Sequence, residues 1–464
     1  MRLIALNASK TVATILASSL VSSAAFSAPV DQTFTTTQIK EDKAQASANG
    51  FTHDQKLGGT TRNFWAHVRS DRNTYFQIPN KQGESKPTRL AATWVQGTIL
   101  EYRSGFTQGT IGFATQAAVY NQIALERGHG QLAGGVNRTL VDSDGDAVGQ
   151  WSKLGLGNIQ ARISNTTLTV GRQNIYTPVL EVNAVLSLPS SFEGISLHSE
   201  ELSNLSFDLG TFDRISPYTQ QSLRRFGTEY GNPQASAGHV NIAGMTYTPS
   251  QALKAEWFAS KVEDIWTQHF LGITHELGDP DNLSLSSSFS YYRTREQGQA
   301  RLGHIDNDTY SLGLSLQHQN HTLNVGWQQV GGNEPFDYLG ETDAIHLANT
   351  LVTDFNGPNE KSLAFSYSVN MAPYGIPGLS LMAYTARGWG IDGTHYQGSG
   401  YDVRAMDGEK HTESGFIANY VIQSGPLRDT RFFFLYGTNR ASENQADGTM
   451  TETRLVTTIP FDFL

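Results

Sequence analysis

The stretch that decides the fold is residues 283–330, where polar and apolar side chains alternate. It begins Leu283-Ser284-Leu285-Ser286-Ser287-Ser288-Phe289-Ser290-Tyr291. Successive side chains of a β-strand point to opposite faces, so one face of this strand carries Leu, Phe and Tyr around a single Ser, and the other carries only Ser. The same alternation returns in residues 309–317 and 322–330. Three consecutive strands with one apolar and one polar face are predicted, but the pattern alone does not say which face meets water.

The connections between predicted strands settle the class of β-protein. Tight turns rich in Gly, Pro, Asn and Asp, such as residues 278–281 and 424–426, alternate with long polar loops such as 124–151 and 331–360. Short turns at one rim and long loops at the other are typical of outer-membrane barrels. About 18 strand-like runs predict an all-β transmembrane β-barrel. A barrel of this size leaves an aqueous channel unless its long extracellular loops are folded into the pore.

The ends and the composition fit an exported barrel. Arg2 and Lys10, the apolar run 11–21 and the small residues that follow predict a signal peptide over residues 1–27. Residues 28–57 show no period and predict a flexible periplasmic leader before the barrel at 58–464. The chain has no cysteine, so disulfides cannot hold it together. The net charge of -10, without a basic stripe, argues against nucleic acid as a partner.

Four segments carry a family resemblance: residues 102–110 (YRSGFTQGT), 333–340 (NEPFDYLG), 354–361 (DFNGPNEK) and 420–426 (YVIQSGP). With them, the chain from about residue 50 to its end closely resembles the OprD family of outer-membrane porins. The resemblance implies a monomeric barrel in the cell outer membrane, a passive diffusion channel for small hydrophilic solutes such as amino acids, small peptides or carboxylates. Its other partners would be outer-membrane lipid and lipopolysaccharide. Some relatives resemble chitoporins, so an oligosaccharide channel is the alternative.

The resemblance also implies a constriction with an acidic and a basic side. On the acidic side, Asp343, Asp354 and Tyr338 match the family's pocket, and Tyr230 matches a further tyrosine. On the basic side, Arg454 stands at a ladder position, Arg69 matches across a one-residue insertion, Arg89 matches more loosely, and Arg431 shares the parity of Phe433. Other ladder positions hold Leu186, Asn419, Phe433 and Leu435 instead of Arg or Lys, so we expect the pore to favour cations.

Other residues of the chain could carry metal binding, gating or catalysis. Asp142, Asp144 and Asp146 could coordinate calcium, but the spacing does not fit an EF-hand and a solvated loop tip is favoured. His346 could titrate and gate the pore, although a lone His in a loop is more often a polar contact. Glu334 and Asp337 with Asp343 and Asp354 could be the paired catalytic carboxylates of an outer-membrane enzyme, yet no hydrolase triad or zinc motif is visible. A channel without enzyme activity, metal or cofactor is therefore predicted.

Overall fold

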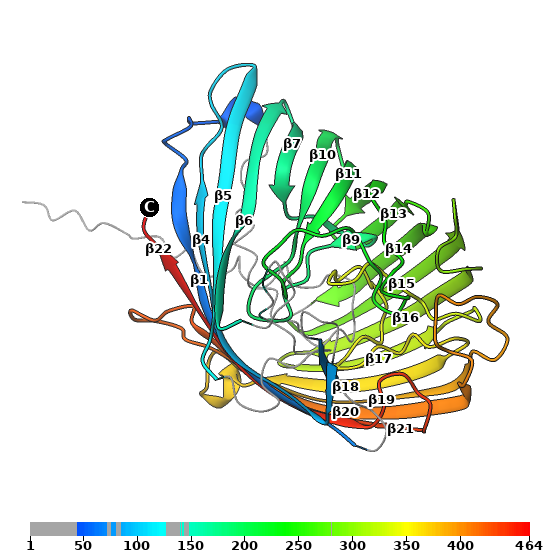
Figure 1. Cartoon of the computed structure of the whole chain (residues 1–464). Helices are drawn as coiled ribbons and strands as arrows, with labels where there is room; N and C mark the ends of the chain where they lie inside the picture. Colours follow the sequence, from blue (N-terminus) through cyan, green and yellow to red (C-terminus); the bar gives the residue numbers. More distant parts are fainter. Residues whose placement is uncertain are drawn as a thin grey trace, which may run out of the picture.

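The computed structural model describes residues 44–71, 76–79, 85–126, 140, 142, 148–279 and 281–464. Eighteen antiparallel strands form one sheet, which closes into the barrel seen in Figure 1. The ring is closed because β1 pairs with both β4 and β22, and because β7 pairs with β10. The predicted barrel of about 18 strands is confirmed, whereas the predicted signal peptide at 1–27 lies outside the described residues.

The bounds of the elements follow the alternating runs of the sequence. The barrel strands are β1 (Lys56–Ser70), β4 (Leu90–Arg103), β5 (Ile111–Ala124), β6 (Gln150–Ile163), β7 (Thr166–Gln173), β10 (Ser191–Leu202), β11 (Leu205–Ser216), β12 (Val240–Ser250), β13 (Leu253–Val262), β14 (Trp266–Asp279), β15 (Leu283–Glu296), β16 (Asp306–His318), β17 (His321–Gln329), β18 (Lys361–Asn370), β19 (Leu379–Asp392), β20 (Asp407–Val421), β21 (Arg431–Ala441) and β22 (Met450–Asp462). Short hairpins pair β2 (Phe76–Pro79) with β3 (Ser85–Thr88), and β8 (Tyr176–Thr177) with β9 (Leu180–Glu181). The 3-10 helices η2 (Gln45–Ser47) and η4 (Ala372–Tyr374) complete the set. In the described part of the chain, no helix has the length and hydropathy to cross a membrane.

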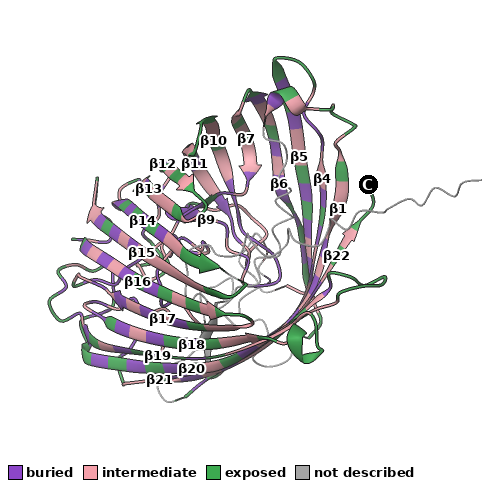
Figure 2. Cartoon of the chain, turned by 180° about the vertical axis from the view of Figure 1, so that it is seen from behind, coloured by how far each residue is buried: buried purple, intermediate pink, exposed green. Residues whose placement is uncertain are grey.

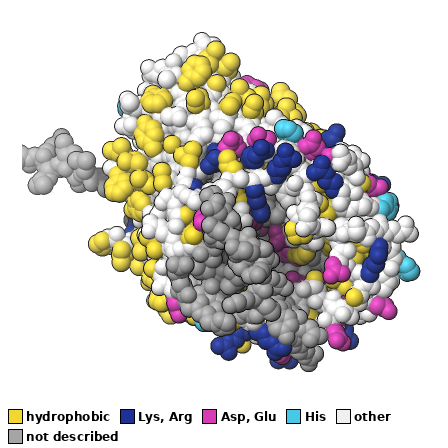
Figure 3. All heavy atoms as spheres, in the orientation of Figure 1, with side chains coloured by type: hydrophobic (Ala, Val, Ile, Leu, Met, Phe, Trp, Pro, Cys, Tyr) yellow, Lys and Arg dark blue, Asp and Glu magenta, His cyan; other side chains and the backbone are white. Residues whose placement is uncertain are grey.

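The apolar face of the strands is the outer face. In β16, Leu312, Leu314 and Leu316 are 49%, 47% and 43% exposed, while Thr309 and Ser311 are buried toward the lumen. Figure 2 shows the same alternation of buried and exposed residues along neighbouring strands. Figure 3 shows hydrophobic side chains crowded on the outer wall over β1, β4 and β5, and charged side chains around the hollow at the centre of the view. The barrel therefore presents its apolar face to lipid and its polar face to the lumen.

Most tight turns lie at one rim and most long loops at the other, and the three-residue turn 263–265 at the rim of the long loops is an exception. At one rim β6 meets β7 through two residues, and Ser164 there has a φ of 50°, so the chain reverses within a left-handed turn. The barrel's C-terminal end and residues 44–55 lie at this same rim, which is the periplasmic one. The loops 174–190, 217–239 and 331–360 start from the opposite, extracellular rim.

Residues 44–57 differ from the expected flexible leader. Gln45 is 4% exposed, and its Nε2 donates to the carbonyl oxygens of Thr107 at 2.8 Å and Gly109 at 3.2 Å. Its Oε1 accepts from Nε of the buried Arg162 at 3.1 Å. These bonds join residue 45 to the periplasmic turn between β4 and β5 and to β6, and β1 begins already at Lys56. The rest of the expected leader, residues 28–43, lies outside the described residues.

The inner loops fill much of the lumen, as the sequence predicted. Short β-bridges join Val182 to Thr342 and Thr228 to Leu339, so loops from different parts of the chain pair inside the barrel. Their apolar side chains pack with lumen-facing wall residues, and Phe226, Phe336 and Leu339 are all buried. This packing holds the loops at fixed positions across the pore.

Candidate functional site

One carboxylate organises the junction of the inner loops. Asp337 is 5% exposed, and its Oδ1 accepts hydrogen bonds from the backbone N–H groups of Glu229, Tyr230 and Tyr338 at 3.2, 3.1 and 2.8 Å. Burial raises the pKa of Asp337 to about 6, although these amide bonds oppose the shift. Asp337 therefore positions two tyrosines of the predicted acidic side from two different loops.

Tyr230 and Tyr338 form hydrogen bonds to the same carboxylate. The hydroxyl groups of Tyr230 and Tyr338 donate to the same oxygen of Asp354, Oδ2, at 2.6 and 2.9 Å. The two rings lie edge to face with centroids 6.1 Å apart. Burial raises the pKa of Asp354, the two hydroxyl groups oppose the shift, and the charge of Glu360 adds to it. Three of the four residues predicted for the acidic side thus form one hydrogen-bonded cluster.

Asp343 lies beside this cluster. Its backbone N–H donates to the Glu181 carbonyl oxygen at 3.1 Å, which ties the loop 331–360 to the β8–β9 hairpin. Burial raises the pKa of Asp343 to about 7, with the charges of Glu181 and Asp354 adding and His346 opposing. The structure therefore brings all four predicted residues of the acidic side to one region of the lumen.

His346 is an ion-pair partner and not the lone loop histidine that the sequence suggested. Its Nε2 lies 2.5 Å from Oε2 of Glu181, and its ring meets Phe270 edge to face at 6.0 Å. Burial lowers the pKa of His346, but the charge and hydrogen bond of Glu181 more than offset this, so the net shift is upward. The pair fixes the β8–β9 hairpin against the loop 331–360.

Sequence reasoning missed further carboxyl groups of the same junction. Burial raises the pKa of Glu229 to about 7, and the neighbouring charge of Asp354 adds to the shift. Glu341 pairs with Arg224, with its Oε1 2.9 Å from Nη2. No local signal marks Glu229 or Glu181, because each lies on a loop far in sequence from Asp354.

Two of the four predicted basic residues face the lumen from the barrel wall. Arg454 shares the inward parity of the buried Glu452 and Val456, and its Nη2 lies 2.6 Å from Oε1 of Glu452. Its charge is therefore balanced by a neighbour two residues away on the same face of β22. Arg431 shares the parity of the buried Phe433 at the periplasmic end of β21.

Arg69 was wrongly expected to belong to the basic side. Phe64, Ala66 and Val68 of β1 are buried toward the lumen, so Arg69 points outward, and it is exposed near the extracellular end of β1. The insertion that was allowed in matching Arg69 shifts its parity by one, which moves a side chain to the other face. Arg89 lies just before β4, exposed at the extracellular end.

The lumen-facing arginine of β1 is Arg62, which sequence reasoning missed. It is 1% exposed, and its Nη1 donates to the carbonyl oxygens of Ala184 and Leu186 at 2.9 and 2.6 Å. The parity of Thr60, Arg62 and Phe64 was the available signal. Lys153 acts similarly, since its ammonium group donates to the carbonyl oxygens of Pro217 and Gln220. Both cations fasten inner loops to the wall.

Apolar residues stand where the family resemblance expected basic ones. Leu186, Phe433 and Leu435 are 2%, 6% and 2% exposed and belong to one buried cluster with Phe64 and Val456. Adjacent side chains alternate along β21, so Phe433 points inward and Phe432 outward, and the buried Phe433 offers no free stacking surface to a solute.

Two buried side chains of β20, Glu413 and His411, hold the loop 331–360 in place. Glu413 accepts hydrogen bonds from the backbone N–H groups of Val352 and Thr353 at 3.1 and 2.8 Å and from the hydroxyl of Tyr384 at 2.8 Å. Glu360 Oε1 lies 2.8 Å from Nε2 of the fully buried His411. These contacts bracket Asp354 from both sides along the chain.

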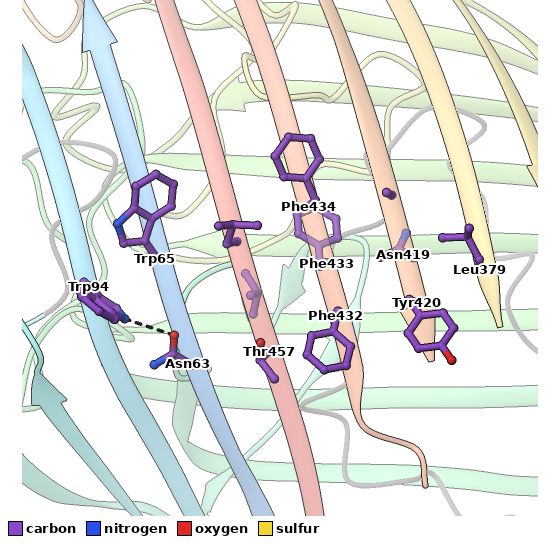
Figure 4. A pocket seen from close by; sticks show the side chains of 13 residues that line it. Asn63, Trp65, Trp94, Leu379, Asn419, Tyr420, Phe432, Phe433, Phe434 and Thr457 are labelled. Atoms are coloured by element: carbon purple, nitrogen blue, oxygen red, sulfur yellow. Dashed lines mark hydrogen bonds between the residues drawn. The ribbon is translucent and has the colours of Figure 1, made fainter. Parts of the chain in front are cut away.

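Two other candidates do not form a solute site. Of the proposed calcium ligands only Asp142 is described, and no cluster of three or more metal-ligating side chains occurs among the described residues. A hollow of about 480 Å³ is lined by Trp65, Trp94, Phe432, Phe434 and neighbours, as Figure 4 shows. These four side chains stand at outward positions of their strands, so the hollow opens on the lipid side of the wall.

Comparisons with known proteins agree with this architecture. Residues 49–463 match the family model described as outer membrane porin, OprD family. The chain is similar to Porin D of Pseudomonas aeruginosa, with 33% identity over 90% of this chain and 94% of that protein, and to the porin-like protein GalP of Pseudomonas putida, with 27% identity over 90% and 95%. It is also similar to the crystal structure of OccD3 (OpdP) of Pseudomonas aeruginosa, with 41% identity, a TM-score of 0.80 and coverage of 91% and 94%. The chain belongs to the OprD family of outer-membrane porins.

Proposed function

We propose that this outer-membrane channel for small solutes prefers solutes that carry a positive charge, because its constriction is acidic. The observation that carries the proposal is the Tyr230–Asp354–Tyr338 cluster with Asp343 beside it. In a narrow lumen the effective dielectric constant is low, so fixed carboxylates attract a passing cation more strongly than they would in bulk water.

The charge balance of the loop junction supports the proposal. In the described part of the chain its carboxyl groups outnumber its cations. Arg224, His346 and, close to Glu341, Lys153 stand against the acids Glu181, Glu229, Asp337, Glu341, Asp343 and Asp354. Two lumen-facing arginines of the wall already have partners. Arg62 donates to loop carbonyl groups, and Arg454 forms an ion pair with Glu452. The resulting field favours amines and guanidines over carboxylates as solutes, and leaves carbohydrates without a specific attraction.

The test is the reversal potential of single channels under a salt gradient. We expect Asp343→Asn with Asp354→Asn to shift the reversal potential toward that of a non-selective pore and to slow lysine uptake in liposome swelling. The matched control is Asp402→Asn with Asp407→Asn, which removes two exposed carboxylates outside the constriction. An acidic-side double variant with unchanged selectivity, or a control with an equal effect, would refute the proposal.

We also propose that the protein has no catalytic activity and acts as a single barrel. Glu334 and Asp337 bind backbone N–H groups, Glu334 from Asp306 at 2.9 Å, which makes them loop braces. One chain already closes the whole sheet and removes its edges, so no second copy is needed for the pore. Hydrolytic activity of the purified protein, or a pore that assembles only from several chains in light scattering, would contradict this.

A further inference from the structure

Four cations gather on the outer wall at the extracellular end of the barrel. They are Lys361 of β18, Arg387 of β19, Lys410 of β20 and Arg440 of β21, and all four are exposed. Each stands next to lumen-facing residues, since Ser362, Ala386, His411 and Asn439 are buried. Because side chains alternate along a strand, the four cations point away from the pore.

The strand register places these cations close together. Lys361 pairs with Trp389, and Trp389 pairs with Lys410, so these two lysines share one row across β18, β19 and β20. Arg387 pairs with Thr412, and Thr412 pairs with Arg440, which makes a second row one outward position lower. Strands lie about 4.8 Å apart, so the two cations of each row have backbones about 10 Å apart.

No described residue neutralises the four charges. Within the described part of the chain, their side chains form neither hydrogen bonds nor ion pairs. Below them, the outward positions of β18 to β21 hold no Asp or Glu and include Phe365, Tyr367, Phe416 and Tyr436, which are 44%, 49%, 39% and 45% exposed. A cationic band thus stands directly above an apolar and aromatic band.

The outward cations of β15 differ from those of β18 to β21. Arg293 lies 2.9 Å from Asp308 on β16, and Arg295 also lies 2.9 Å from Asp308. That sector carries its own counter-ions, whereas the sector from β18 to β21 leaves its cations for an external anion.

We infer that the outward face formed by Lys361, Arg387, Lys410 and Arg440 binds the phosphorylated headgroup of lipopolysaccharide in the outer leaflet. The long loops mark this end of the barrel as extracellular, so the band meets the outer leaflet of the outer membrane. Several unpaired cations in two rows suit a lipid that carries more than one phosphate group, and its acyl chains would lie on the aromatic band below. This inference is independent of the selectivity of the pore, because all four side chains point away from the lumen.

The experiment measures lipid retention by native mass spectrometry after incubation of the full-length barrel in detergent with lipid A. The variant is Lys361→Gln, Arg387→Gln, Lys410→Gln and Arg440→Gln combined, and we expect about tenfold or greater loss of retained lipid A. Lys410→Gln with Arg440→Gln should give an intermediate loss. The matched control, Lys56→Gln with Arg428→Gln, removes two exposed cations from the periplasmic rim and should retain lipid A as the parent does.

Single-channel conductance and heat-modifiable migration show that each variant is folded, and both should be unchanged. Phosphatidylglycerol is the competing probe, and it should displace lipid A poorly. Equal retention by the parent and the fourfold variant would overturn the inference. Equal competition by phosphatidylglycerol would also overturn it, because the band would then bind anionic lipid of any kind.

Discussion

At the scale of single residues, the acidic side is defined by groups that titrate near neutral pH. Burial and neighbouring charges raise the pKa of Asp343 and of Glu229 to about 7 each. Above this pH both groups carry negative charge, and as the pH falls through 7 both bind protons and the constriction becomes less negative. Because the two groups share neighbours, the transition belongs to the cluster and not to one carboxyl group.

We therefore expect the cation preference to weaken as the pH is lowered through about 7. Reversal potentials measured across this range should follow a titration curve in the parent and lose most of their pH dependence in Asp343→Asn with Glu229→Gln. Asp402→Asn should keep the curve of the parent. A preference that does not change with pH in the parent would contradict the titration of this cluster.

The hydroxyl groups of Tyr230 and Tyr338 should set the pKa of Asp354. The hydrogen bonds from Tyr230 and Tyr338 oppose the upward shift in the pKa of Asp354, so removing them should raise that pKa further. Tyr230→Phe with Tyr338→Phe keeps the rings and removes the two donors. We expect this variant to lose cation preference at a higher pH than the parent, measured by the same reversal potentials. A shift in the opposite direction would show that the hydroxyls do not stabilise the carboxylate.

At the scale of elements, the inner loop 174–190 is held to the barrel wall by Arg62 of β1. Arg62→Met removes a donor from two buried carbonyl groups, each worth about 1–3 kcal/mol when left unsatisfied. We expect the loop to leave its position, with a larger and noisier single-channel conductance and a lower unfolding temperature. Arg69→Met is the matched control on the same strand, because Arg69 points outward and should leave conductance unchanged. Equal conductance in Arg62→Met and the parent would show that the loop needs no such anchor.

At the scale of the whole molecule, the barrel depends on one seam between the two ends of the chain. β22 pairs with β1 from Ser70 and Met450 to Gly58 and Asp462, and the Phe463 N–H donates to the Leu57 carbonyl at 2.8 Å. Deleting residues 461–464 exposes backbone groups at the periplasmic end of β1. We expect a much smaller heat-modifiable, folded fraction in outer membranes. Phe463→Ala keeps the backbone bond and should lose less, and equal folding of the truncated and parent proteins would contradict the role of this seam.

The sequence by itself determined the barrel, its strand count and the rim from which the functional loops start. These features are local, because alternation is a relation between adjacent residues and a turn needs only a few residues with the right φ. The pairing of Arg454 with Glu452 could also be predicted from the sequence, since residues i and i+2 of a strand share a face. The family motifs then indicated which loop residues belong to the acidic side.

Only the tertiary structure decided which charged side chains contact one another and which of them face the lumen. Tyr230 and Asp354 are 124 positions apart, and their hydrogen bond depends on how the inner loops fold across the lumen. The roles of Arg62 and Arg69 depend on strand parity, where an error of one residue exchanges the lumen for the lipid face. The raised pKa of Asp343 depends on burial in the folded molecule and on the charge of Glu181, which lies on another loop, and no local pattern contains either.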